Sequence, residues 1–181
     1  MAFILLLTMA KSAEGLLVRM QGDEEQTILI VDDSEDDALL MRLAFARAEF
    51  SANLQIVPDG EDAVAYLEGQ FPYSDRGRFP LPTLILLDLN MPRKNGFEVM
   101  EWLRAQPEFR HLPIIVLTSS MRGSDVEKAF ELGATSFFVK PGRVDDLVSM
   151  IRCMRAWLHF SHFPRVGGAA RDGQDAVLDA H

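Results

Sequence analysis

The chain has 181 residues, 48% of them hydrophobic, and a formal net charge of −9 at pH 7. This length suits one well-buried domain and is too short for two of ordinary size. The acidic balance argues against a nucleic-acid partner, whose phosphates require clustered Lys and Arg. A single cysteine, Cys153, excludes an intramolecular disulfide and a cysteine metal cluster, which favours a reducing compartment and a cytoplasmic location.

The first ten residues are apolar except for Thr8. They lack the basic start of a signal peptide and are far shorter than the ~20 residues of a membrane helix, so we expect no membrane partner. Residues 1–26 are interpreted as an N-terminal extension, and three origins stay open. It is an export signal, the product of a mis-assigned start codon, since Met20 lies just before the first predicted strand, or a short helix that packs on a partner.

Apolar runs alternate with segments of helical periodicity from residue 27 to residue 160. In chain order they predict a strand at 27–31, a helix at 34–50, a strand at 53–57, a helix at 61–68, a strand at 83–87, a helix at 97–106, a strand at 114–117, a helix at 124–132, a strand at 136–139 and a helix at 144–160. The run at 83–87 is typical of a strand buried on both faces of a parallel sheet.

Five strands that alternate with five helices predict an α/β fold with a doubly wound, five-stranded parallel sheet between two layers of helices. The domain covers residues 27–160. Residues 161–181 are rich in Gly, Ala and Asp without a sustained period, so we expect a disordered C-terminal tail. Ser124 and Glu127 predict a capping box at the start of the fourth helix.

Polar residues follow four of the predicted strands at the points where the strands end. They are Asp32 and Asp33, Asp88, Thr118, and Lys140. Carboxyl ends of parallel strands meet at one edge of a sheet, where ligands of open α/β sheets bind. Three carboxylates brought together repel unless a cation neutralises them, and oxygen ligands suit Mg²⁺. If Asp88 accepts a phosphoryl group as the nucleophile, the metal, Lys140 and the Thr118 hydroxyl can offset the charge on its oxygens.

With these motifs the sequence resembles the response regulator receiver domain, the flavodoxin-like phosphorylation switch of two-component signalling. The resemblance is carried by Asp32-Asp33, Asp88, Met91-Pro92, Gly96, Thr118 and Lys140-Pro141. It implies that Asp88 accepts a phosphoryl group from a sensor histidine kinase. It also implies a Mg²⁺ cofactor, bound directly by Asp33, through water by Asp32, by Asp88, and by the backbone carbonyl of Asn90.

The resemblance further implies a switch formed by Thr118 and Phe137, in which the ring rotates inward when the threonine moves. It implies a cis peptide bond between Lys140 and Pro141. Phe138 is interpreted as a core residue. Asp36 and Asp37 are interpreted as charges that suit the start of a helix rather than as ligands.

No effector domain is predicted after the last helix, so we expect a stand-alone receiver that is not an enzyme. The segments 58–61, 72–74 and 88–96 resemble regulators paired with phytochrome-type histidine kinases. Output would then come from partner binding or phosphorelay, or the chain would act as a phosphate sink.

Two other classes of protein share parts of this pattern. A haloacid-dehalogenase-like phosphatase also uses a strand-end Asp, but it needs an acid–base Asp two residues later, where this chain has Asn90. A flavodoxin-like FMN carrier needs a Ser/Thr/Gly phosphate loop after the first strand, where this chain has Asp32-Asp33-Ser34-Glu35.

The last predicted helix carries two apolar stripes. The first faces the core and consists of Val144, Leu147, Val148, Ile151 and Leu158. The second consists of Met150, Cys153, Trp157 and Phe160, and we expect one core to be unable to cover both. Exposed aromatic residues and Met are typical of interfaces, so the second stripe predicts a homodimer through this helix. The alternative is that the N-terminal segment or the tail covers it.

Overall fold

Strands and helices alternate along residues 26–164 and 166, the part of the chain described in this computed structural model. The strands are β1 (Thr27–Val31), β2 (Asn53–Val57), β3 (Leu84–Leu87), β4 (Ile114–Thr118) and β5 (Ser136–Val139). The helices are α2 (Glu35–Arg47), α3 (Gly60–Glu68), α4 (Gly96–Ala105), α5 (Gly123–Glu131) and α6 (Val144–Phe160). The ten predicted elements are confirmed. The predictions for residues 1–25 and for 165 and 167–181 fall outside the described residues.

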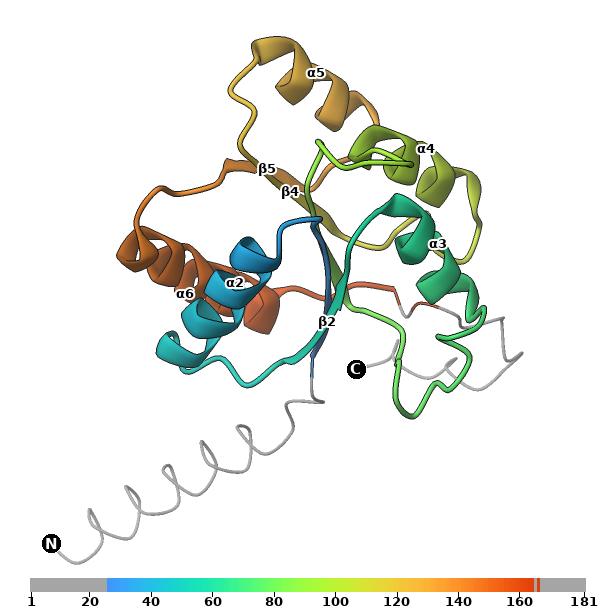
Figure 1. Ribbon diagram of the computed structural model, residues 1–181, viewed down its shortest axis with the longest axis horizontal. Helices are drawn as coiled ribbons and strands as arrows, with labels where there is room; N and C mark the ends of the chain where they lie inside the picture. The colour runs from blue at the N-terminus through green and yellow to red at the C-terminus, as the bar shows by residue number, and fades with distance from the viewer. Residues whose placement is uncertain (1–25, 165, 167–181) are drawn as a thin grey trace, which may run out of the picture.

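The strands form one parallel sheet in the order β2-β1-β3-β4-β5, with β3 at its centre (Figure 1). Helices α2 and α6 cover one face, and α3, α4 and α5 cover the other. This confirms the doubly wound, three-layer fold. The strand order reverses between β1 and β3, and such a reversal opens a crevice at the carboxyl ends of the strands.

Side chains of β1 explain how the sheet joins the two helical layers. Ile28 and Ile30 pack with α2 and α6, whereas Leu29 and Val31 pack with α3, α4 and α5. All residues of β1, β3 and β4 are buried. Polar side chains of the site therefore begin only where these strands end.

The start of α5 differs from the prediction. Its N-cap residue is Arg122, whose side chain makes no capping hydrogen bond. Because the helix begins at Gly123, Ser124 already lies inside the first turn and forms no capping box with Glu127. A reciprocal capping box is found instead at α4, between Asn95 and Glu98.

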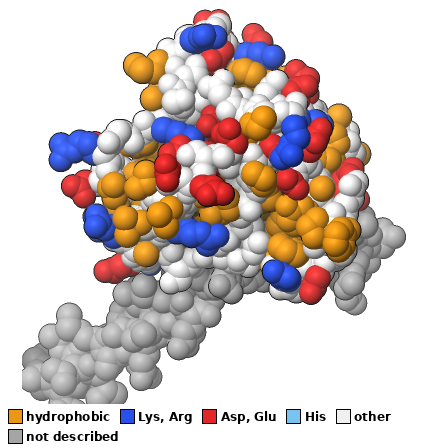
Figure 2. Space-filling view, in the orientation of Figure 1, with side chains coloured by type: hydrophobic (Ala, Val, Ile, Leu, Met, Phe, Trp, Pro, Cys, Tyr) orange, Lys and Arg blue, Asp and Glu red, His pale blue; other side chains and the backbone are white. Residues whose placement is uncertain are grey.

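The long loop between α3 and β3 is anchored by Arg76. Its guanidinium donates to the backbone carbonyls of Tyr66 at 2.7 Å and Leu67 at 2.6 Å, which end α3, and to that of Phe79 at 3.3 Å. The rings of Tyr66, Tyr73 and Phe79 pack together with centroids 5.2 to 6.0 Å apart. Figure 2 shows hydrophobic side chains gathered over this region of α3 and the loop. The loop is thus part of the packed structure.

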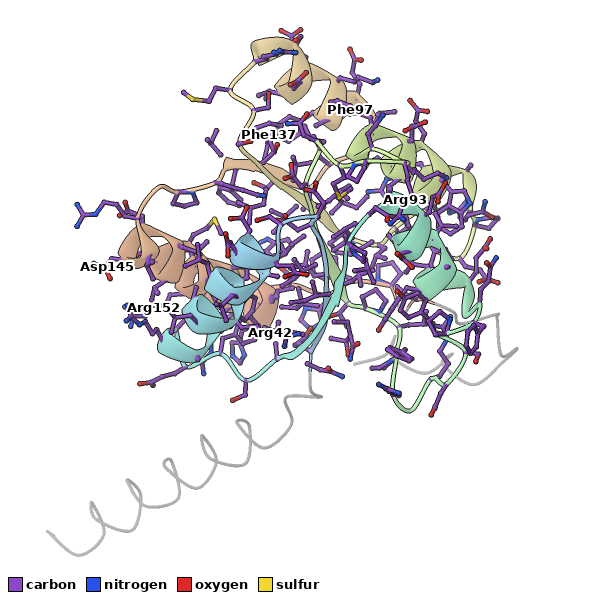
Figure 3. The ribbon with its side chains drawn as sticks, viewed as in Figure 1. Arg42, Arg93, Phe97, Phe137, Asp145 and Arg152 are labelled. Carbon is purple, nitrogen blue, oxygen red and sulfur yellow. The ribbon has the colours of Figure 1, made fainter. Side chains whose placement is uncertain are left out.

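Helix α6 lies beside α2. Arg152 and Arg155 of α6 donate to the carbonyls of Arg47 at 3.3 Å and Glu49 at 3.0 Å, at the end of α2. Figure 3 shows Arg152 on α6 and Arg42 on the neighbouring α2. The predicted core stripe of α6 is confirmed, with Val144 partly buried and the other four residues buried.

The second stripe of α6 is split rather than wholly exposed. Met150 and Trp157 pack partly buried against the same core, so the expectation that one core cannot cover both stripes is wrong for these two residues. Trp157 is also covered from beyond the helix, where the Phe163 ring packs on it with centroids 5.2 Å apart. Cys153 is exposed, and Phe160 is 80% exposed.

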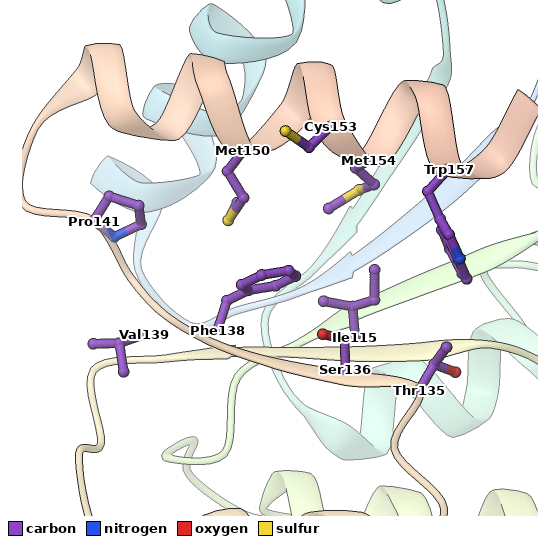
Figure 4. A pocket seen from close by; sticks show the side chains of 10 residues that line it. All are labelled: Ile115, Thr135, Ser136, Phe138, Val139, Pro141, Met150, Cys153, Met154 and Trp157. Atoms are coloured by element: carbon purple, nitrogen blue, oxygen red, sulfur yellow. The ribbon is translucent and has the colours of Figure 1, made fainter.

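A groove of about 490 Å³ separates α6 from the edge strand β5 (Figure 4). Met150, Met154 and Trp157 point into it from the helix, and Phe138 points into it from the strand. Phe138 was predicted to be a core residue but is 38% exposed. The groove explains this difference, because it separates the Phe138 ring from α6.

The anchored loop provides a test of stability. Replacing Arg76 with Met should lower the free energy of unfolding by about 2 kcal/mol, because the carbonyls that end α3 lose charged hydrogen bonds. Arg78→Met is the matched control, since Arg78 lies over the Phe79 ring and should cost only about 0.5 kcal/mol. Urea denaturation measures both. Equal losses would show that the carbonyl contacts are not the cause.

Candidate functional site

The carboxyl ends of four strands meet at one edge of the sheet, next to the start of α2. Asp32 follows β1, Asp88 follows β3, Thr118 ends β4 and Lys140 follows β5. Asp32, Asp88 and Thr118 are buried. Figure 2 shows acidic side chains gathered near the middle of the face that it presents. The structure therefore brings the predicted site residues together.

The ammonium group of Lys140 lies at the centre of this site. Its Nζ is 2.8 Å from Oδ2 of Asp88, 2.8 Å from Oδ2 of Asp32 and 2.7 Å from Oδ2 of Asp37. One cation thus contacts three carboxylates, one that follows β1, one in the first turn of α2 and one that follows β3. Because one ammonium faces three carboxylates, the site keeps a net negative charge.

The pKa values of the site reflect burial and this shared charge. Burial alone would lower the pKa of Lys140, but hydrogen bonds with Asp32, Asp37 and Asp88 outweigh it and raise that pKa. At Asp32, burial raises the pKa, and Lys140 opposes that shift without reversing it. In a simple ion pair the pKa of the acid would fall, so burial is the stronger effect at Asp32. Lys140 stays protonated at neutral pH, and Asp32 is only partly compensated.

Asp37 has a role that could not be predicted from its position in the sequence. Its backbone N–H donates to the Ser34 hydroxyl at 3.2 Å, which agrees with the predicted helix start. Its carboxylate also binds Lys140, which is 103 residues away. Three acidic residues in a row look alike in sequence. The signal that could have singled out Asp37 is its third position in the helix, from which a side chain can reach back toward the N-cap.

Asp32, Asp33 and Asp88 can hold a metal ion. Each offers a carboxylate oxygen, and these atoms lie within 4.8 Å of one another. Asp33 is exposed, so the group faces solvent on one side. The hard oxygen donors suit Mg²⁺ or Mn²⁺, and the negative charge left beside Lys140 favours a second cation. The backbone N–H of Asn90 donates to Oδ1 of Asp88 at 3.2 Å, which keeps Asn90 at the same site.

Thr118 joins two loops at this edge. Its hydroxyl oxygen accepts from the Asn90 side-chain amide at 3.4 Å and from the Ser120 N–H at 3.3 Å. Phe137, the predicted switch partner, lies on the adjacent strand β5, partly buried against the core of the α3, α4 and α5 layer. Figure 3 places Phe137 on the α5 side of the sheet.

The peptide bond between Lys140 and Pro141 differs from the expectation. Among the described residues the one cis peptide bond joins Phe71 and Pro72, so the Lys140–Pro141 bond is not cis. The backbone N–H of Lys140 donates to the carbonyl of Thr118 at 2.8 Å, and its ammonium reaches all three carboxylates in this conformation.

A doubly wound parallel sheet with one ammonium among buried carboxylates at the carboxyl ends of its strands is the architecture of a signalling receiver domain. The chain belongs to the response regulator receiver domain family, which matches residues 28–152. None of the helices in the described part of the chain is long and apolar enough to cross a membrane.

Three relatives place the chain within this family. Response regulator Rcp1 from Synechocystis is 32% identical over 145 residues, which are 80% of this chain and 97% of Rcp1. The structure of Mn²⁺-bound Rcp1 matches with a TM-score of 0.69 at 33% identity, over 77% of this chain and 99% of that one. RPA3017, a response regulator in red light signalling of R. palustris, matches with a TM-score of 0.74 at 37% identity, over 78% and 99% of the two chains. The phosphorylated cyanobacterial phytochrome response regulator RcpA matches with a TM-score of 0.70 at 29% identity and the same coverage.

The shared charge of Lys140 provides a second test. Without divalent cations, Lys140→Met should lower the free energy of unfolding by about 3 kcal/mol, because buried carboxylates lose their cation. Added Mg²⁺ should recover much of this loss by neutralising the same oxygens. Lys128→Met, which removes an exposed charge over the Phe97 ring, is the control. Urea denaturation with EDTA or Mg²⁺ measures both. A Lys140→Met protein as stable as wild type in EDTA would show that Lys140 does not stabilise the buried carboxylates.

Proposed function

We propose that the chain accepts a phosphoryl group on Asp88 from a sensor histidine kinase. The observation that carries this proposal is the contact of Lys140 with Asp88 at 2.8 Å beside two further carboxylates. We propose Mg²⁺ as the cofactor, held by Asp33 directly, Asp32 through water, Asp88, and the backbone carbonyl of Asn90.

The proposed transfer is a displacement at phosphorus. A carboxylate oxygen of Asp88 forms the new O–P bond as the N–P bond of the kinase phosphohistidine breaks, and the imidazole nitrogen leaves with the bonding electron pair. The bound cation would neutralise charge on the phosphoryl oxygens. Lys140 adds a second positive charge from its place beside Asp88. The Thr118 oxygen accepts in both of its contacts, so its own hydrogen is available to donate to a phosphoryl oxygen.

We propose that movement of Thr118 toward the phosphoryl group draws Phe137 inward, because the two residues lie on adjacent strands. The chain then acts as a switch rather than an enzyme. Asn90 supports this view over a phosphatase of the haloacid-dehalogenase type, since a side-chain amide cannot transfer protons as a carboxyl group does.

The kinase is proposed to be of the phytochrome type, because RcpA is a phytochrome response regulator and RPA3017 is a response regulator in red light signalling. Its docking surface is proposed to include α2, which begins at the site and exposes three leucines. Leu39 is 68% exposed, and Leu40 and Leu43 are also exposed. Figure 2 shows hydrophobic side chains gathered in the region of α2 and α6. Output follows by partner binding or phosphorelay, with a phosphate sink as the alternative.

We also propose a cytoplasmic location and no nucleic-acid or membrane partner. The net charge of −9 and the single cysteine support these proposals.

A homodimer through α6 is proposed as the assembled form. Phe160 and Cys153 are exposed on this helix, and Met150 and Trp157 line the open groove beside it. The strand β5 forms an edge of the sheet, so a second copy could cover its apolar side chains together with the groove.

The phosphorylation site is tested with acetyl phosphate and Mg²⁺. Asp88→Asn should abolish hydroxylamine-sensitive labelling, because the amide is not a nucleophile. Asp36→Asn, which changes an exposed acid in the first turn of α2, should label like wild type. Intact-mass spectrometry measures both, and a remaining acyl phosphate on folded Asp88→Asn protein would move the site elsewhere.

The dimer is tested by charge substitution. Trp157→Glu and the more exposed Phe160→Glu should both give folded monomers at tens of micromolar that still label at Asp88. Phe71→Glu alters an exposed aromatic residue far from α6 and should leave the dimer intact. Sedimentation velocity gives the answer, and a wild-type chain that remains monomeric with and without acetyl phosphate would remove the dimer from this proposal.

A further inference from the structure

We infer that Arg93 is a positioning residue for the cation site, because it ties the loop that carries Asn90 to the start of α3 through Asp59. This inference rests on the proposed cation site. It adds two residues that lie outside the group of carboxylates around Lys140.

The carboxylate of Asp59 is divided between two tasks. It is fully buried, and its Oδ1 accepts from the backbone N–H groups of Glu61 at 2.7 Å and Asp62 at 2.9 Å, which caps α3. Its Oδ2 is buried as well, and the guanidinium of Arg93 is its charge partner. The same guanidinium lies 3.6 Å from Asp62 and 3.9 Å from Glu61. A buried carboxylate oxygen without a partner is costly, so this pair resists separation.

Arg93 has a backbone conformation that needs support. Its φ is +63°, in the left-handed region that residues other than glycine seldom adopt. Such a conformation persists where neighbouring contacts hold it. Figure 3 shows Arg93 at the start of α3, the helix whose N-cap residue is Asp59. The ion pair is therefore well placed to hold this turn of the loop.

Backbone contacts fix the same loop at two other points. The Gly96 N–H donates to the carbonyl of Leu89 at 3.1 Å, and the Gly60 N–H donates to that of Lys94 at 3.2 Å. A Cβ at Gly60 would approach the Lys94 oxygen to 2.5 Å, so α3 and the loop meet closely. Asn90 lies between Asp88 and this fixed region.

The Arg93–Asp59 pair affects how well the cation site is ordered before a cation binds. Mg²⁺ requires near-octahedral geometry, so a ligand on a mobile loop must first be ordered. Loss of the Arg93–Asp59 pair removes the side-chain anchor of the loop, which leaves only the backbone contacts to order it and weakens cation binding. Once the site is saturated, Asp88, Lys140 and Thr118 are unchanged, so the transfer step should keep its rate.

The experiment compares Arg93→Gln with Asp59→Asn. Asp59→Asn keeps an oxygen for the α3 cap and removes the charge that meets Arg93. Each variant should bind Mg²⁺ about tenfold more weakly by isothermal titration calorimetry. The double variant should bind no more weakly than either single variant, because both remove one interaction. The labelling rate with acetyl phosphate at saturating Mg²⁺ should stay within about twofold of wild type.

Two control variants separate this role from general effects. Arg93→Lys keeps the charge and should recover part of the affinity, whereas Lys94→Gln removes a charge from the same loop and should leave affinity unchanged. Equal Mg²⁺ affinity in wild type and Arg93→Gln, or additive losses in the double variant, would overturn the inference. If the Asp59→Asn protein does not fold, the Arg93→Gln and Arg93→Lys variants provide the test, because the side chain of Arg93 is half-exposed. A wild-type chain that binds no Mg²⁺ would instead refute the cation site itself.

Discussion

The arrangement of the site depends on one ammonium group shared by three carboxylates. Lys140 follows the edge strand β5. Of its three partners, Asp32 follows β1, Asp37 lies in the first turn of α2, and Asp88 follows β3. Without this cation the two buried acids, Asp32 and Asp88, would repel each other across the crevice. The contact thus joins the edge of the sheet to its centre at the place where the strand order reverses.

This shared ammonium also explains why the site suits a second cation. A divalent ion held by Asp32 and Asp88 would meet the same carboxylates that Lys140 contacts. Charge on the site then depends on both cations together, and an incoming phosphoryl group adds negative charge that they can offset. The lysine is therefore part of the electrostatic balance before any phosphate arrives.

Features that depend on a local sequence pattern could be predicted, whereas contacts between residues far apart in the chain could not. Apolar runs indicated the strands, and the polar residues at the ends of those runs indicated Asp32, Asp88, Thr118 and Lys140. The partnership of Asp37 with Lys140 depends on a helix meeting a strand 103 residues later, which no local pattern records. The exposure of Phe138 likewise depends on the distance between α6 and β5. At α5, the side chains of Ser120 and Asp125 bond to each other, an arrangement that a capping pattern does not reveal.

The Arg76 anchor makes the segment between α3 and β3 an unusual kind of surface loop. Loops of this length commonly tolerate extra residues, since lengthening a flexible loop costs little entropy. Here an insertion between Arg76 and Phe79 would draw the guanidinium away from the carbonyls that it binds. The exposed neighbourhood of Phe71 carries no such constraint from Arg76. It is consequently the part of this loop best suited to carry a fluorescent label or an epitope.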